Sequence, residues 1–309
     1  MAVPGTSTPA QRLSASWLMV LATLLFAGMG VCVKQASAEA GTAEVVFFRG
    51  FVGAVMIGAL AWRQRLPLRT SVPRQHFWRS VAGVSALSLW FYSIGHLPLA
   101  TAVTLNYMSS VWMGVILIAL QLWRRWRKAP HRPIHPMILL AVLVGFLGVA
   151  LVLRPTIQRD QWLAGLVGLL SGGLSAWAYL QVAALGRSGE PEHRVVFYFS
   201  LFGTLVGLAL MGIVHLGQQQ PWIAPSLATW GWLLGIGVFA TLAQLAMTRA
   251  YALGQPLAMA SLQYLGIVHA FVLGVWLFGD PVHGLAIVGT VLIVVAGVTA
   301  SRLGNTIRD

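Results

Sequence analysis

Ten long apolar stretches run along the chain, separated by short segments that carry proline, arginine and other polar residues. Each has about 17–24 residues, and about 20 apolar residues are needed for a helix to cross the hydrocarbon core of a bilayer. Backbone polar groups inside a bilayer must be bonded within their own segment, so each stretch predicts a membrane-spanning α-helix. Transmembrane β-strands would be shorter and would alternate strictly between apolar and polar positions. The predicted spans are residues 16–35, 44–62, 79–97, 100–122, 136–153, 162–182, 195–216, 228–251, 256–278 and 283–301.

The composition excludes a soluble protein. Hydrophobic residues make up 58% of the 309 residues and charged residues only 9%, whereas a soluble domain carries about 25% charged residues. Cys32 is the single cysteine, which excludes a disulfide framework and a cysteine-based metal site. The sequence contains no phosphate-binding Gly-Lys-Ser/Thr loop and no His/Glu/Asp cluster with metal-ligand spacing. We therefore expect no ATP-driven motor, no metal and no cofactor.

The net charge of +13 is interpreted as a sign of topology. Membrane proteins concentrate lysine and arginine in their cytoplasmic segments. A cytoplasmic N-terminus places 16 of the 20 basic residues on the cytoplasmic side and leaves four elsewhere. This predicts a multi-pass protein of a bacterial inner membrane, with both termini cytoplasmic and no nucleic acid partner. The 16 are Arg12, Arg63, Arg65, Arg69, Arg74, Arg79, Arg124, Arg125, Arg127, Lys128, Arg132, Arg187, Arg194, Arg249, Arg302 and Arg308; the other four are Lys34, Arg49, Arg154 and Arg159.

Two short matches indicate an internal repeat. Val45-Val46-Phe47-Phe48 followed by Gly53 matches Val195-Val196-Phe197-Tyr198 followed by Gly203, and Thr104-Leu105-Asn106-Tyr107 matches Ser261-Leu262-Gln263-Tyr264. The matches lie in the second and fourth helices of two five-helix halves, residues 1–155 and 156–309. Because five is odd, the second half must insert upside down relative to the first. The predicted fold is therefore an all-α integral membrane protein of two inverted five-helix repeats around a central cavity, an arrangement typical of alternating-access transporters.

Several ordered segments resemble the drug/metabolite transporter superfamily, specifically its EamA-type members. This resemblance covers about residues 16–301. It implies ten helices in two five-helix repeats and a substrate among amino acids, nucleoside-like metabolites, organic anions or drugs. The chain departs from the usual pattern at Ser109-Ser110, where proline is common, and at residues 123–128, which replace an acidic helix end. The segments that carry the resemblance are residues 44–50, 96–102, 145–148, 244–251, 263–266 and 278–281.

Charged residues inside the membrane are candidates for function because each costs at least about 2.5–3.5 kcal/mol at a span centre. Arg49 and Lys34 are candidate anchors for an anionic group of the substrate. An Arg49–Glu44 ion pair and a Lys34 side chain reaching to the interface are the structural alternatives. We assign Glu44, Arg249 and His269 to gating or coupling. For Arg249 the alternative is a cytoplasmic membrane anchor, and for His269 it is a neutral buried histidine.

Polar aromatic and amide side chains within the spans are the other candidates for substrate binding. Asn106-Tyr107 and Gln263-Tyr264 occupy equivalent positions of the two repeats, which favours a shared role. The alternative is that these groups only bond neighbouring helices together. The same spans contain glycine pairs at a spacing of four, including Gly203/Gly207, that predict close helix packing. The predicted substrate-binding set is Lys34, Arg49, Trp90, Tyr92, Asn106, Tyr107, Tyr179, Gln244, Gln263 and Tyr264.

These features predict a secondary transporter of a small organic metabolite and not an enzyme. The alternatives are a multidrug or toxic-compound exporter, an intramembrane lipid-processing enzyme, and a structural or sensory membrane protein. The expected partners are the lipid bilayer and a small solute, with a homodimer left open. Because no carboxylate lies near the middle of a span, facilitated diffusion or exchange is favoured over proton coupling.

Overall fold

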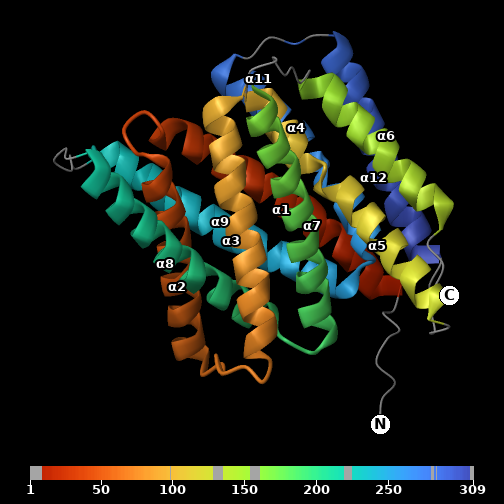
Figure 1. The fold of residues 1–309 in the computed structure, drawn as a ribbon, viewed down its shortest axis with the longest axis horizontal. Helices are drawn as coiled ribbons and strands as arrows, with labels where there is room; N and C mark the ends of the chain where they lie inside the picture. Colours follow the sequence, from red (N-terminus) through yellow and green to blue (C-terminus); the bar gives the residue numbers. More distant parts are fainter. Residues whose placement is uncertain are drawn as a thin grey trace.

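The structure is a computed structural model that describes residues 9–97, 99–127, 135–153, 161–218, 225–279, 282 and 284–306. The described residues form α-helices and contain no strand (Figure 1). The helices are α1 (Pro9–Ala36), α2 (Thr42–Gln64), α3 (Pro73–His96), α4 (Leu99–Tyr107), α5 (Ser109–Trp126), α6 (Pro136–Leu153), α7 (Trp162–Arg187), α8 (Glu192–Gln218), α9 (Leu227–Leu253), α10 (Pro256–Gln263), α11 (Leu265–Phe278) and α12 (Gly284–Thr306).

The predicted all-helical membrane fold is confirmed. Eight of the predicted spans correspond to single helices, while the fourth consists of α4 and α5 and the ninth of α10 and α11. Within the described residues, nine segments are long and apolar enough to cross a membrane, and α3 is not among them. Lys128, Arg132, Arg154, Arg159, Asp280 and Arg308, which entered the charge and motif arguments, lie outside the described residues.

The third span begins six residues earlier than predicted, at Pro73. A proline suits the first turn of a helix because its missing N–H would have no partner there. The polar residues that follow had placed the predicted start at Arg79. Arg79, the first residue of the predicted span, lies in the second turn of α3 and is only 3% exposed. Helix packing, which local hydropathy does not report, buries this arginine.

The repeat-equivalent motifs mark the two interrupted spans. The regular helix of the fourth span is interrupted at Met108, directly after Asn106-Tyr107, and that of the ninth at Tyr264, directly after Gln263. The helical bonds continue through each interruption: the Met108 N–H donates to the Thr104 carbonyl (3.1 Å), and the Ile267 N–H donates to the Tyr264 carbonyl (3.0 Å). Each pair of short helices is thus one interrupted span.

The main helix pairings follow a symmetric scheme. α2 packs along α8 and α6 along α12, at opposite sides of the molecule in Figure 1, while α1 packs along α9 and α3 along α7. In the predicted repeat, α1, α2, α3 and α6 correspond to α7, α8, α9 and α12. The α2–α8 and α6–α12 pairings each join a helix to its own counterpart. Replacing every helix by its counterpart turns the α1–α9 pairing into the α7–α3 pairing. This pattern supports the inverted repeat, which stays a prediction.

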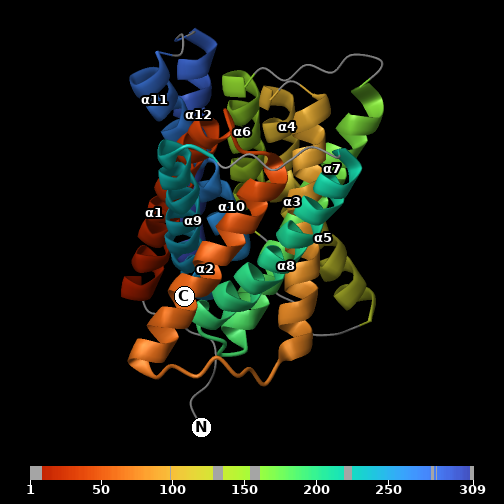
Figure 2. The same cartoon turned by 90° about the vertical axis from the view of Figure 1, so that its left-hand side faces the viewer.

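The α2–α8 crossing brings two backbones into contact (Figure 2). A Cβ atom on Gly50 would lie 2.6 Å from the Thr204 nitrogen and 2.8 Å from the Ser200 carbonyl oxygen. A Cβ atom on Gly207 would lie 2.6 Å from the Phe47 Cα atom. Glycine at these positions is what allows the close approach. The glycine-packing prediction is correct for Gly207 and wrong for Gly203, which faces open space.

This difference predicts opposite effects for two neighbouring substitutions. Gly207→Ala should destabilise the protein, because the Phe47 backbone must move, at a cost of about 1–3 kcal/mol. Gly203→Ala should leave stability unchanged or raise it, since alanine is favoured over glycine in a helix by about 1 kcal/mol. Thermal unfolding of both purified variants measures the difference. Equal melting temperatures for the two would show that α2 and α8 do not touch at Gly207.

Candidate functional site

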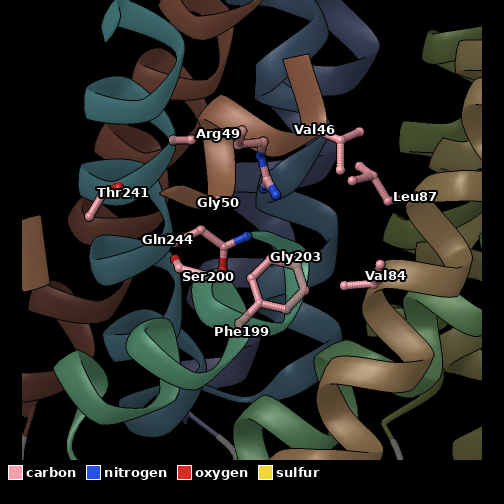
Figure 3. Close-up of a pocket in the computed structure, with 11 residues that line it drawn as sticks. Val46, Arg49, Gly50, Val84, Leu87, Phe199, Ser200, Gly203, Thr241 and Gln244 are labelled. Carbon is pink, nitrogen blue, oxygen red and sulfur yellow. The ribbon is translucent and has the colours of Figure 1, made fainter. Parts of the chain in front are cut away.

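A narrow cavity lies between α2, α3, α8 and α9 (Figure 3). Two of these helices come from each half of the chain, and in the predicted repeat α2 corresponds to α8 and α3 to α9. The free volume is about 10 Å³, close to the least that holds one water molecule. The lining residues are Val46, Arg49, Gly50, Val84, Leu87, Phe199, Ser200, Gly203, Ala240, Thr241 and Gln244.

Arg49 and Gln244 are the two predicted site residues that line this cavity. The Arg49 side chain extends from α2 into the space above Gln244 and Phe199 (Figure 3). Its guanidinium carbon is 5.5 Å from the centroid of the Phe199 ring. Among the described residues, Arg49 forms no ion pair, so the alternative of an Arg49–Glu44 pair is wrong. Gln244 is 8% exposed, and its Oε1 atom has no hydrogen-bond partner among those residues.

The Glu44 side chain forms a hydrogen bond with the backbone at the start of α2. Its Oε2 atom accepts a hydrogen bond from the Gly41 N–H (2.7 Å), which satisfies the backbone donor of the N-cap residue. A carboxylate at this position also interacts favourably with the helix dipole. Glu44 therefore stabilises the helix end that carries Arg49.

Arg79 is a polar residue of the same region that the sequence analysis missed. Its guanidinium carbon lies 3.9 Å from the centroid of the same Phe199 ring. Both Nε and Nη1 of Arg79 are buried and have no hydrogen-bond partner within the described part of the chain. The signal in the sequence was the polar segment of residues 73–78, which we had left outside the third span.

A second polar layer joins Tyr179 to Gln263 through Tyr251. The rings of Tyr179 and Tyr251 are stacked with centroids 5.7 Å apart, and the Tyr251 hydroxyl donates to Gln263 Oε1 (2.9 Å). Tyr251 is 1% exposed and was missed as a site residue, although it lies in a segment that carried the resemblance.

Asn106, Tyr107 and Tyr264 lie between helices. Asn106 Nδ2 donates to Ser171 Oγ (3.0 Å), and Ser171 in turn donates to the Ala86 carbonyl (2.9 Å), which connects α4, α7 and α3. The Tyr107 and Tyr264 rings are 6.2 Å apart. The equivalent motifs thus meet near the two interruptions, outside the cavity beside Arg49.

The remaining predicted residues lie away from this cavity. Trp90 is half-buried on α3, and Tyr92 is 42% exposed and stacks on His96. Lys34 is exposed, with its Nζ atom 3.7 Å from the centre of the Phe278 ring. Arg249 forms an exposed ion pair with Glu192 (3.5 Å). His269 Nδ1 lies 3.3 Å from Thr23 Oγ1 and so bonds α11 to α1.

A buried ion cluster connects the start of α3 to the start of α8. The Glu190 carboxylate accepts hydrogen bonds from His76 Nε2 (3.0 Å), Thr70 Oγ1 (3.0 Å) and Arg194 Nη1 (3.0 Å). Arg194 also donates to the Pro67 carbonyl. Burial alone would raise the pKa of Glu190. The hydrogen bonds from His76, Thr70 and Arg194 together lower it by more than burial raises it, so the pKa of Glu190 lies below the usual value. This cluster fixes the ends of the two helices that carry Arg79 and Phe199.

Comparison with known proteins gives consistent matches. The model of the EamA-like transporter family matches residues 13–154. The pseudopaline exporter CntI of Pseudomonas aeruginosa (strain UCBPP-PA14) is 35% identical over 288 residues, covering 92% of this chain and 95% of the relative. The S-adenosylmethionine uptake transporter of Rickettsia prowazekii (strain Madrid E) is 20% identical over 258 residues, covering 79% of each protein. A solved crystal structure has the same fold, with a TM-score of 0.78 at 16% identity, covering 94% of this chain and 99% of that chain.

The Glu190 cluster predicts a stability that depends on pH. A carboxylate whose pKa is lowered by folding stabilises the protein above its unfolded pKa of about 4.3 and loses this contribution as the pH falls through the lower folded value. We expect Glu190→Gln to lower stability at pH 7 by about 1–3 kcal/mol and to flatten the acid limb of melting temperature against pH. Glu192→Gln, which removes an exposed pair, should change little. Parallel acid limbs in the wild type and Glu190→Gln would contradict this role for Glu190.

Proposed function

The chain belongs to the EamA-like transporter family and is a small-metabolite transporter, and we propose that it moves its solute by alternating access between its two five-helix halves. The observation that carries this proposal is the cavity between α2 and α3 of one half and α8 and α9 of the other. Related helices from inverted halves offer two nearly equivalent packings, one open to each side of the membrane.

We infer that Arg49 binds a negatively charged group of the solute and that the Gln244 amide lies beside it. Arg49 forms no ion pair with the described carboxylates, and a guanidinium can pair with a carboxylate or phosphate through two parallel hydrogen bonds. Tyr179 and Gln263, joined through Tyr251, form the next polar layer. The Arg249–Glu192 pair is exposed at the ends of α9 and α8, where a change in helix tilt would break it. It is our candidate gate.

The proposed topology places both termini in the cytoplasm of a bacterium, with the protein in the inner membrane. The relatives include proteins named for export and for uptake, so the family supports transport in either direction. An exporter of toxic compounds is the second candidate function; the intramembrane arginine favours an anionic metabolite over the cationic and neutral apolar compounds that such an exporter would carry. We propose no enzymatic activity, because the described residues that line the cavity carry apolar, amide and hydroxyl groups and one arginine.

Transport of pseudopaline into proteoliposomes tests the binding role of Arg49, since pseudopaline is the solute named for the relative at 35% identity. We expect Arg49→Gln to reduce uptake at low solute concentration about tenfold or more, the effect of losing one charge-assisted pair. Arg63→Gln, which removes an exposed arginine from the last turn of the same helix, should retain wild-type uptake. Equal uptake by wild type and Arg49→Gln would refute a binding role for Arg49.

The described residues that line the cavity include no carboxylate, which supports facilitated diffusion or exchange. Collapsing the pH gradient across the liposome with nigericin should therefore leave pseudopaline uptake unchanged. His269→Gln should behave as the wild type does in the same assay, because His269 bonds two helices outside the cavity. If uptake stops when only the pH gradient is removed, the transporter is coupled to protons and the proposal of diffusion or exchange is wrong.

A further inference from the structure

We propose that Arg79 is a second substrate-binding residue, which together with Arg49 forms a two-arginine site for a dianionic group of the solute. The inference rests on the proposed function and extends it, since it names the charge of the solute and a residue on a third helix. The shared chemistry is two negative charges close together, carried either by two carboxylates or by one phosphate ester.

The two guanidinium groups meet at one aromatic ring. The guanidinium carbon of Arg79 is 3.9 Å from the centroid of Phe199, and that of Arg49 is 5.5 Å from the same point. The two cations can therefore be no further apart than the sum of these distances. Arg49 comes from α2, Arg79 from α3 and Phe199 from α8. Residues of three helices thus bring two positive charges beside one aromatic ring.

The described part of the chain supplies no carboxylate to either arginine. The chain has seven acidic residues, of which Glu39, Glu44, Glu190 and Glu192 are described. Glu39 bonds Ser226 and Glu44 bonds Gly41, while Glu190 bonds His76, Thr70 and Arg194, and Glu192 pairs with Arg249. Two like charges thus lie close together in a medium of low dielectric constant. An anion placed between them would interact favourably with both charges.

The Arg79 side chain has the unused donors that such an anion would need. Arg79 is 3% exposed, and its Nε and Nη1 atoms lack a hydrogen-bond partner among the described residues. Buried donors are nearly always bonded in proteins, and exceptions often mark functional sites. Contact with an aromatic ring does not supply a hydrogen-bond acceptor for these N–H groups. They therefore remain able to donate two parallel hydrogen bonds to a carboxylate or a phosphate.

Gly83, one turn further along α3, makes room for this arrangement. A Cβ atom at Gly83 would overlap Arg79 Nη1 and would lie 3.0 Å from Phe199 Cε2. The overlapping atom is the end of a flexible side chain, so Gly83→Ala should fold but displace the guanidinium. This variant therefore changes the position of the charge without removing it.

The experiment measures ligand-induced thermal stabilisation of the purified full-length protein. Glutarate and glycerol 3-phosphate are the dianionic probes, and pentanoate is the matched monoanion of the same chain length as glutarate. A ligand raises the melting temperature according to its concentration relative to its Kd. The variants are Arg79→Gln, Arg49→Gln and Gly83→Ala, with Arg74→Gln as the control, because Arg74 is exposed on the same helix.

We expect at least one dianion to bind the wild type and the Arg74→Gln variant about tenfold or more tightly than pentanoate. Arg79→Gln should abolish this preference and leave pentanoate binding as in the wild type, and Gly83→Ala should weaken dianion binding. Preference for glutarate indicates a dicarboxylate solute, and preference for glycerol 3-phosphate a phosphate ester. If neither dianion is preferred by the wild type, or if Arg79→Gln keeps the preference, the inference is overturned.

A measurement without ligand separates substrate binding from a structural role. Replacing a buried charge that has no counter-ion by an apolar side chain of similar size often stabilises a protein. Arg79→Met should therefore raise the melting temperature of the ligand-free protein while removing dianion binding. A lower melting temperature, with dianion binding intact in Arg79→Gln, would make Arg79 a packing residue. Failure of this inference leaves the proposed function standing if Arg49→Gln still reduces pseudopaline uptake, whereas wild-type uptake by Arg49→Gln would refute the binding role itself.

Discussion

The backbone contact between α2 and α8 is the constraint from which the geometry of the cavity follows. Gly50 lies against Ser200 and Thr204 so closely that no side chain fits between the helices. The residues that precede the two contact positions are Arg49 and Phe199. The contact therefore fixes the cation of one half against the aromatic ring of the other. Movement of α2 relative to α8 would change the distance between Arg49 and Phe199. A solute bound at this crossing could therefore influence the conformation.

Charge is the second constraint on this part of the molecule. A charged residue at the centre of a membrane span costs at least about 2.5–3.5 kcal/mol, and the structure places two arginines against one ring. Meanwhile the described carboxylates are used at helix ends and loops, where they cap α2, bond Ser226 or tie α3 to α8. The described acidic residues thus stabilise the scaffold, and none of them pairs with Arg49 or Arg79 beside the cavity. That division supports recognition of an anion by the protein itself.

The candidate site shows where inference from the sequence was sufficient. Arg49 and Gln244 were identified because a charge and an amide within long apolar spans are costly unless they serve a purpose, and both line the cavity. Tyr179 and Gln263 were identified on the same grounds and belong to one polar layer. Lys34, Tyr92, Arg249 and His269 satisfied the same criterion but lie elsewhere. A polar residue in a span can face the cavity, a neighbouring helix or the interface, and its type does not distinguish these positions.

The sequence by itself determined the spans and the all-helical architecture, because the cost of exposing backbone polar groups and charges to lipid acts residue by residue along the chain. Only the tertiary structure decided that Arg79 is buried, that Glu44 caps its own helix, and that Tyr251 connects Tyr179 to Gln263. These outcomes depend on which helices touch, and contacts such as that of Gly50 with Ser200 join residues far apart in the chain. The hydropathy of a segment predicts whether it lies in the lipid bilayer or in water. The hydrogen-bond partner of each polar group depends instead on which helices pack together.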